Sequence, residues 1–250
     1  MLKQTIIGLS VLVSCTGAAA EEYAVAVQNW ATVLERFVDD QGRVSFNGLA
    51  QDRRELDEFV AYIARVSPSS APEQFDTLAK VIAFHINAYN ALAMHGVLKE
   101  DIPADFDSFF KRVGFFKFHK VIIGNKTTSL YDYENKVIRP LGEPRVHFAL
   151  NCMVRDCPRL PRQPFIAGEL EAQLQAAAVE FFTSDKHLRI NNQKREVAVS
   201  KILSFYTSDF VESNKRQDLI GYINQYRVDA IPASYRVRYL PYDWTINHQP

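Results

Sequence analysis

The spacing of apolar residues along the chain predicts a protein built mainly from helices. Apolar residues recur every three or four positions in three early segments, which predicts helices over 22–39, 52–65 and 74–97. The third of these is apolar around much of its circumference, so we expect it at the centre of the core. Ser129 and Asp132 resemble a capping box, which predicts a short helix after Ser129. Later helices are predicted over 167–182, from Ser200 to near Tyr206, and over 215–226.

Short strands are predicted between these helices. Alternating segments lie at 117–122, before a turn at Gly124-Asn125, at 187–199 as a hairpin, and at 235–240. The strictest alternation runs from Arg145 to Cys152 and predicts a strand with its apolar face inward. The order of elements has no regular βαβ rhythm. The sequence therefore predicts a single mixed α+β domain, with several helices packed on a small, mostly antiparallel sheet.

The first 20 residues have the pattern of a secretory signal peptide. Lys3 is followed by a short apolar stretch from Ile6 to Val13, and Ala18-Ala19-Ala20 offers the small residues that a signal peptidase requires. We therefore expect an exported protein, periplasmic or secreted, whose globular domain spans 21–250. Leu12-Val13-Ser14-Cys15 also resembles a bacterial lipoprotein box, which makes lipid anchoring at Cys15 an alternative and the membrane a partner in that case only.

Composition excludes several classes of protein. Apolar residues make up 47% of the chain and charged residues 23%, as in ordinary globular domains. The formal net charge is zero, so nothing in the overall charge favours nucleic acid or an anionic membrane as a partner. No glycine-rich phosphate loop, Gly-x-Ser-x-Gly elbow or His-Glu-x-x-His sequence is present, and we expect no cofactor. A small-molecule or peptide ligand of unknown identity is the remaining kind of partner.

Several blocks of sequence, taken together, resemble one known family. They include Ile86-Asn87-Ala88-Tyr89-Asn90, Arg139-Pro140, Pro144 to Cys152 with Cys157-Pro158, Ser200-Lys201-Ile202-Leu203, and Tyr242-Asp243-Trp244. This order and spacing is similar to domain of unknown function 547 (DUF547), most strongly over 75–210. The family usually has Trp where this chain has His85. The resemblance implies a shared fold and candidate positions, but no agreed reaction.

Cys152 and Cys157 are the central candidates for chemistry. In one hypothesis a thiol of this pair attacks an amide or thioester-like bond, with His147 as base and Glu134 or Asp209 as the orienting acid. In a continuous strand His147 and Cys152 would point to opposite faces, so attack by Cys152 requires a bend near Asn151. Cys157 lies in a loop and could fold back toward His147 more freely. In the other hypothesis the two cysteines form a structural disulfide in a noncatalytic binding or accessory domain.

Metal binding and reversible redox use are weaker alternatives for the same cysteines. The spacing His-x4-Cys-x4-Cys matches no familiar short zinc pattern, so we expect no metal site. The four-residue spacing also differs from the Cys-x-x-Cys of thioredoxin-like proteins.

Five further polar residues are candidates for substrate binding. Asn87 and Asn90 lie on one side of the long helix, where they would either pin a neighbouring loop or line a polar pocket. Tyr206 and Asp209 are three apart and would form either a structural pair or part of a site. Arg145 completes the set and, like Arg139, is also a potential ion-pair partner of Glu134.

Overall fold

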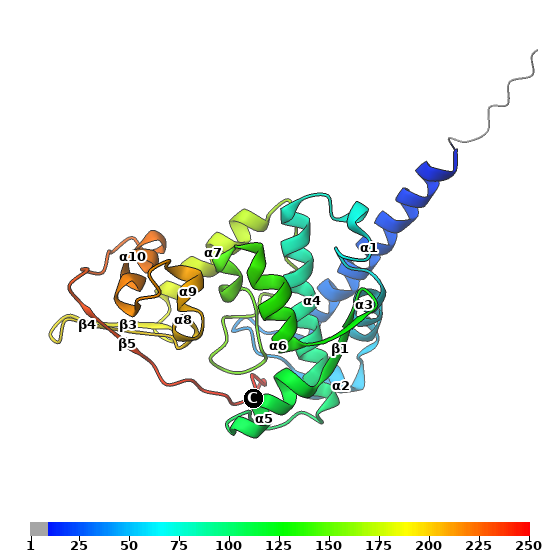
Figure 1. Cartoon of the computed structure of the whole chain (residues 1–250). Coiled ribbons are helices and arrows are strands. Elements are labelled where there is room, and N and C mark those ends of the chain that lie inside the picture. Colours follow the sequence, from blue (N-terminus) through cyan, green and yellow to red (C-terminus); the bar gives the residue numbers. More distant parts are fainter. Residues whose placement is uncertain (1–9) are drawn as a thin grey trace, which may run out of the picture.

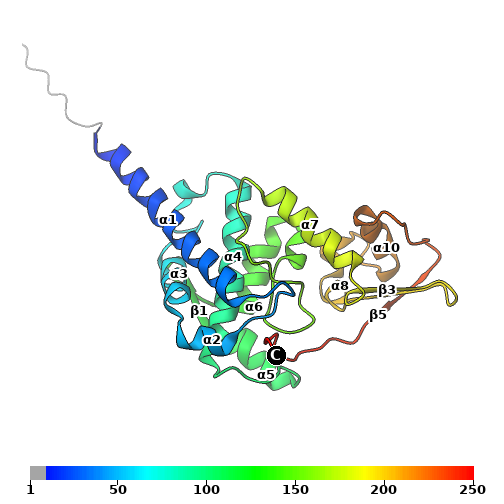
Figure 2. The same cartoon turned by 180° about the vertical axis from the view of Figure 1, so that it is seen from behind.

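The computed structural model describes residues 10–250, with side chains from residue 17 onward, and is shown from two sides in Figures 1 and 2. The first nine residues of the predicted leader and the side chain of Cys15 lie outside the described residues. Helix α1, Ser10–Phe37, begins within the predicted leader and continues through the helix predicted over 22–39. The following elements are α2 (Phe46–Gln51), α3 (Arg54–Arg65) and η1 (Pro72–Gln74).

Helix α4, Leu78–Lys99, runs through the middle of the molecule, as its pattern predicts (Figure 1). Every residue from Ile82 to Leu98 is buried. Its N-terminus is capped by Thr77, whose hydroxyl accepts a hydrogen bond from the backbone N–H of Lys80 at 3.2 Å. Among the described residues it is the one helix long and apolar enough to cross a membrane, but most of it is covered by other parts of the protein.

Helices α1 and α3 pack against each other beside α4. The rings of Trp30 and Phe59 stack there with centroids 5.7 Å apart. Both side chains are fully buried, and they belong to one core cluster that also contains the buried face of α4. The amphipathic spacing of α1 and α3 therefore correctly indicates which side of each helix is buried in this core.

A short hairpin follows α4 after the segments α5 (Phe109–Val113) and η2 (Gly114–Phe118). Strands β1 (Lys120–Ile123) and β2 (Lys126–Ser129) pair antiparallel, and Gly124 and Asn125 form the predicted turn with φ values of +54° and +65°. Glycine and asparagine adopt this left-handed conformation readily, which suits a two-residue hairpin. Ser129 then caps α6, Leu130–Tyr133, as predicted, and the chain continues into η3, Glu134–Ile138.

The remaining elements build a second core at the end of the molecule opposite α3 (Figures 1 and 2). Helix α7, Leu170–Thr183, packs beside a three-stranded sheet in the order β3-β4-β5, in which β5 runs parallel to β4. The strands are β3 (Leu188–Asn191), β4 (Glu196–Val199) and β5 (Arg236–Tyr239). Between them lie α8 (Ile202–Phe205), α9 (Thr207–Phe210), η6 (Arg216–Asp218), α10 (Leu219–Ile223) and η7 (Asn224–Tyr226).

The α+β class is confirmed, with the strands divided between two small sheets. The prediction of a strand over residues 145–152 is wrong. Residues Pro144–Phe148 form the 3-10 helix η5, after η4 (Arg139–Leu141), and Glu143 caps it by accepting the Arg145 N–H at 3.0 Å. The alternation is misleading because its polar positions do not face solvent: His147 and Asn151 are as buried as their apolar neighbours.

Candidate functional site

A cavity of about 230 Å³ lies where the two cores meet. Side chains from α4, α5, η2, α6, η5, α8 and the C-terminal segment line it, so it exists only in the complete fold. Eight of the 18 lining residues are aromatic: Tyr89, Phe109, Phe116, Tyr131, Phe205, Tyr206, Tyr242 and Trp244. Four candidate residues predicted for catalysis, Glu134, His147, Cys152 and Cys157, line it as well.

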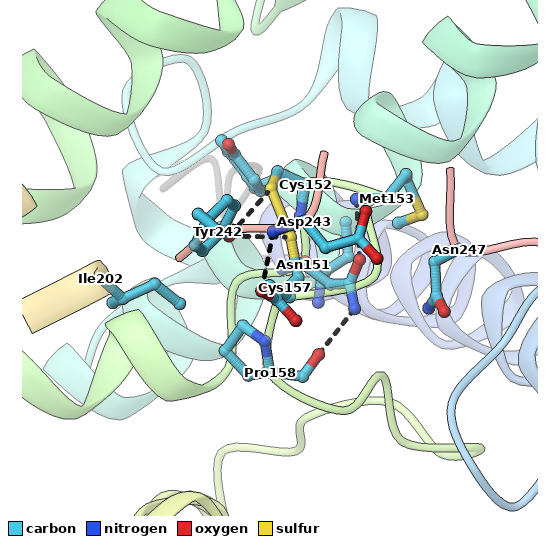
Figure 3. Close-up of a disulfide and its surroundings, with 12 residues drawn as sticks. Asn151, Cys152, Met153, Cys157, Pro158, Ile202, Tyr242, Asp243 and Asn247 are labelled. Carbon is cyan, nitrogen blue, oxygen red and sulfur yellow. Dashed lines mark hydrogen bonds between the residues drawn. A yellow bond between two sulfur atoms is a disulfide. The ribbon is translucent and has the colours of Figure 1, made fainter. Parts of the chain in front are cut away.

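Cys152 and Cys157 form a disulfide in the cavity wall (Figure 3). Their sulfur atoms are 2.34 Å apart and their Cα atoms 6.2 Å apart. Asn151 fixes the loop that joins them: its amide donates to the carbonyl of Pro158 at 2.7 Å and accepts the Met153 N–H at 2.7 Å. Met153 adopts a φ of +64°, a conformation uncommon for such a side chain, so the loop depends on these surrounding contacts.

The Tyr242 hydroxyl points at this disulfide (Figure 3). It lies 3.9 Å from the sulfur of Cys152 and 3.7 Å from that of Cys157. Burial raises the pKa of Tyr242, which keeps the hydroxyl protonated and able to act as a donor. The C-terminal segment thus closes the cavity over the two sulfur atoms.

His147 is held by Asp209 from the second core. Its Nε2 atom lies 2.8 Å from Oδ2 of Asp209, and Arg139 binds both oxygens of the same carboxylate at 2.7 and 2.6 Å. Burial opposes the charge on Asp209, but the hydrogen bonds from Arg139 and His147 outweigh it and hold the pKa of that carboxyl well below its usual range. The imidazole also stacks on Tyr206, with ring centroids 4.0 Å apart.

Glu134 contacts tyrosines rather than the imidazole. Its Oε2 accepts a hydrogen bond from the hydroxyl of Tyr89 at 3.2 Å, and Tyr206 lies beside the same carboxylate. Burial, reinforced by the charge of Glu134, raises the pKa of both tyrosines well above the usual value. Of the two acids proposed to orient His147, Asp209 occupies that position and Glu134 does not.

Asn87 and Asn90 each hold a segment of backbone by two hydrogen bonds. Asn87 donates to the carbonyl of Phe165 at 2.8 Å and accepts its N–H at 2.9 Å. Asn90 donates to the carbonyl of Ala149 at 3.0 Å and accepts the N–H of Asn151 at 2.7 Å. Neither lines the cavity, so their amides act as clamps, and the clamp of Asn90 fixes the bend that precedes Cys152.

Arg145 also lies away from the cavity. Its guanidinium pairs with Glu143 at 2.6 Å and with Glu171 at 2.6 Å, so it contacts neither His147 nor Glu134. His85, where the family usually has Trp, is buried against Tyr133, with its Nδ1 2.6 Å from the hydroxyl. These two residues connect helices and loops around the site without reaching it.

The residues that sequence reasoning missed are Arg139 and the ring of Tyr242. Both occur in blocks that carry the family resemblance, and Arg139 was otherwise considered only as a partner of Glu134. Asp209, the partner of Arg139, lies 70 positions further along the chain. The cysteines that Tyr242 contacts lie 85 and 90 positions before it. Within residues 17–250, no group of three or more His, Cys, Asp or Glu side chains is arranged to hold a metal ion.

The family resemblance is confirmed by comparison with protein-family models. The family described as "Protein of unknown function, DUF547" matches residues 76–182 of the chain. The matched segment supplies Tyr89, Glu134, His147 and both cysteines, whereas Tyr206, Asp209 and Tyr242 lie beyond it. No curated protein and no solved structure matches the chain.

Proposed function

We propose that the protein is an exported ligand-binding protein whose aromatic cavity takes up a small molecule or part of a peptide. The observation that carries this proposal is the disulfide between Cys152 and Cys157 in the cavity wall. A bridged cysteine has no thiolate and cannot act as a nucleophile. In this role the two residues stiffen the wall of a binding site.

The lining indicates the chemistry of the ligand. The aromatic side chains of Tyr206, Tyr242 and Trp244 in the lining favour an apolar or aromatic body. A carboxylate offers about four acceptor positions, and the hydroxyls of Tyr89 and Tyr206 occupy only part of this capacity at Glu134. We therefore propose a ligand that directs an amine or amide N–H group at Glu134. A cavity of about 230 Å³ lies below the ordinary range of drug-sized sites, which favours a small molecule or one or two peptide side chains.

A second candidate function is thiol-dependent hydrolysis or acyl transfer. It is favoured by one observation: His147, held by Asp209, lines the same cavity as both cysteines. A dithiol reductant would first deliver two electrons and two protons to the disulfide. One cysteine thiolate would then attack the acyl carbon while the imidazolium of His147 gives its proton to the leaving group.

Two measurements separate these proposals. The first is the intact mass of the protein purified without reductant, before and after alkylation under denaturing conditions. The binding proposal expects no alkylation of Cys152 and Cys157 and a chain that starts at Glu21. Two alkyl groups would mean free thiols and would favour the second function, and a lipid-sized mass on Cys15 would reveal anchoring.

The second measurement is the shift in melting temperature on adding small aromatic amines and amides, compared with the same compounds blocked at nitrogen. We expect stabilisation of the oxidised protein that is lost in Glu134→Gln, because the amide removes the negative charge facing the ligand. Glu212→Gln on the exposed surface is the matched control and should respond like the parent. If no amine stabilises the oxidised protein, or if Glu134→Gln responds equally, the binding proposal is wrong.

A further inference from the structure

Three phenylalanine rings stand out from the surface on α5 and η2. Phe109, Phe110 and Phe118 are 66%, 84% and 71% exposed, and they are three of the four phenylalanines with exposed rings among the 17 in the chain. We call them the phenylalanine surface. Large apolar side chains that gather on one exposed element mark an interaction site.

The backbone beneath these rings is fixed. Phe115, in the same segment, is buried and stacks on Phe106 with ring centroids 4.4 Å apart. Phe116 packs edge-on against Trp244, and the N–H of Phe106 is bound to the carbonyl of Trp244 at 2.9 Å. The exposed rings therefore rise from a rigid base, beside the C-terminal segment (Figure 1).

The segment that carries the phenylalanine surface is positively charged, although Asp105, Asp107 and Asp132 border it in the chain. Residues 108–131 contain five lysine or arginine residues and no aspartate or glutamate, in a chain whose net charge is zero. Among the described residues, Lys111 is the only one of these five that pairs with a carboxylate, at 2.8 Å from Asp105. Exposed aromatic rings beside cations, of which four have no carboxylate partner among the described residues, match the interfacial region of an anionic membrane.

We infer that the phenylalanine surface binds to an anionic lipid surface. The three rings enter the boundary between headgroups and acyl chains, while Lys111 and Lys120 remain at the level of the lipid phosphates. A second copy of this chain fits the surface poorly, because a symmetric dimer would bring two sets of five cations together. An anionic bilayer offers both the apolar depth and the opposite charge.

The same face is continuous with the cavity. Phe109, Arg112, Lys117 and Tyr131 line the cavity, and all four belong to the positive segment. Arg112 lies over the ring of Trp244 at 4.8 Å and Lys117 over that of Tyr131 at 4.2 Å. Membrane binding would thus place this side of the cavity at the lipid surface, although the inference does not depend on the proposed ligand.

The experiment uses an indole placed on the phenylalanine surface of the full chain. Phe110→Trp is mixed with phosphatidylglycerol–phosphatidylcholine vesicles whose acyl chains carry bromine, which quenches an indole that enters the bilayer. Val228→Trp, at a fully exposed position outside the segment, is the matched control. Because the readout is local, binding through another part of the chain does not imitate it. The quenching measured for the parent is subtracted from that of each variant. We expect the remaining quenching of Phe110→Trp to be at least twofold that of Val228→Trp.

The charge requirement is tested in the same assay. Adding Lys111→Gln and Lys120→Gln to Phe110→Trp should raise the vesicle concentration for half-maximal quenching roughly tenfold or more. Lys194→Gln with Lys215→Gln, two exposed cations elsewhere, should change it less than about twofold. The inference is overturned by equal quenching at positions 110 and 228, by no quenching, or by equal binding to vesicles without phosphatidylglycerol. A dimer that depends on Phe110, without quenching by vesicles, would overturn it in favour of a second copy.

Discussion

Asp209 lies 2.8 Å from Nε2 of His147, although the two residues are 62 positions apart in the chain. His147 belongs to η5 and Asp209 to α9, so the contact joins the DUF547 segment to the part of the chain beyond it. Arg139 holds the same carboxylate from the other side. This arrangement positions the imidazole in the cavity wall and also connects the two cores.

Asp209→Asn should lower the free energy of unfolding by about 2 kcal/mol, because it removes charge-assisted hydrogen bonds to Arg139 and His147. The measurement is urea unfolding at pH 7. Glu180→Gln is the control, since it breaks a similar two-bond pair with Arg159 at an exposed site and should cost about 1 kcal/mol or less.

The effect of Asp209→Asn should also depend on pH. The pKa of Asp209 is lowered in the folded protein, so its stabilising effect is present above the unfolded pKa of about 4 and is lost as pH falls below that value. Parent and variant should therefore converge in acid. Equal stability of the two at pH 7 would contradict the structural role of the pair.

Buried histidines should make the protein sensitive to mild acid. Burial lowers the pKa of His187 to about 3 and that of His85 to about 4, so both remain neutral in the fold but take up protons when it unfolds. The stability that such a buried neutral histidine contributes is fully present above its pKa in the unfolded chain, about 6.5. This contribution declines as pH falls toward the pKa in the folded protein. Between pH 7 and 5, His187 alone should account for a loss of about 2 kcal/mol.

His187→Phe tests this directly. The imidazole stacks on Phe181 with ring centroids 4.0 Å apart, so a phenyl ring should occupy a similar place. Urea unfolding at pH 7 and pH 5 should show a smaller difference for the variant than for the parent, by about 2 kcal/mol. An unchanged difference would mean that His187 is not buried in its neutral form.

The disulfide should stabilise the fold by a modest amount. Cys152→Ser combined with Cys157→Ser should lower the free energy of unfolding by about 2 kcal/mol, since the closed loop is short. Denaturant unfolding without reductant measures it, and the parent with a strong reductant is the control. If the double variant still binds the ligands that stabilise the parent, the bridge serves structure. If it loses an acyl-transfer activity that reductant elicits in the parent, the thiol function gains support.

Asn87 and Asn90 provide a matched pair of clamps. Replacing either with Ala leaves one buried backbone N–H and one carbonyl without their partner, and should cost about 2 to 4 kcal/mol. Only Asn90→Ala should also weaken ligand binding, because it releases the bend next to Cys152. Thermal unfolding and ligand-induced shifts in the two variants measure both effects. Equal ligand binding in the two variants would contradict the role given to Asn90.

Features that depend on neighbouring residues were predictable from the sequence. The apolar circumference of α4 correctly predicted its central burial, and Gly124-Asn125 correctly predicted the β1–β2 turn. Ser129 was identified as a helix cap for the same reason, since it accepts the N–H of a residue three positions later. In each case the decisive interaction joins residues close in the chain, or reflects the balance of apolar and polar positions along one element.

The segment from Arg145 to Cys152 shows where pattern reasoning fails. Alternation predicts a strand when polar residues face water, but His147 and Asn151 are buried. His147 is hydrogen-bonded to Asp209, 62 positions away, and the Asn151 side chain to Pro158, outside the segment. The cap by Glu143 and the clamp by Asn90 shape the backbone instead. No local property of these eight residues reveals that such partners exist.

The sequence by itself determined the helices, the α+β class, the family of residues 76–182 and the identity of the chemically capable side chains. Tertiary structure decided which of them meet. In the fold Cys152 is bonded to Cys157 beside the hydroxyl of Tyr242, and His147 is hydrogen-bonded to Asp209 rather than Glu134. Asn87 and Asn90 are hydrogen-bonded to distant segments of backbone. The physical reason is that hydrogen bonds act over about 3 Å in space, whatever the separation of their partners along the chain.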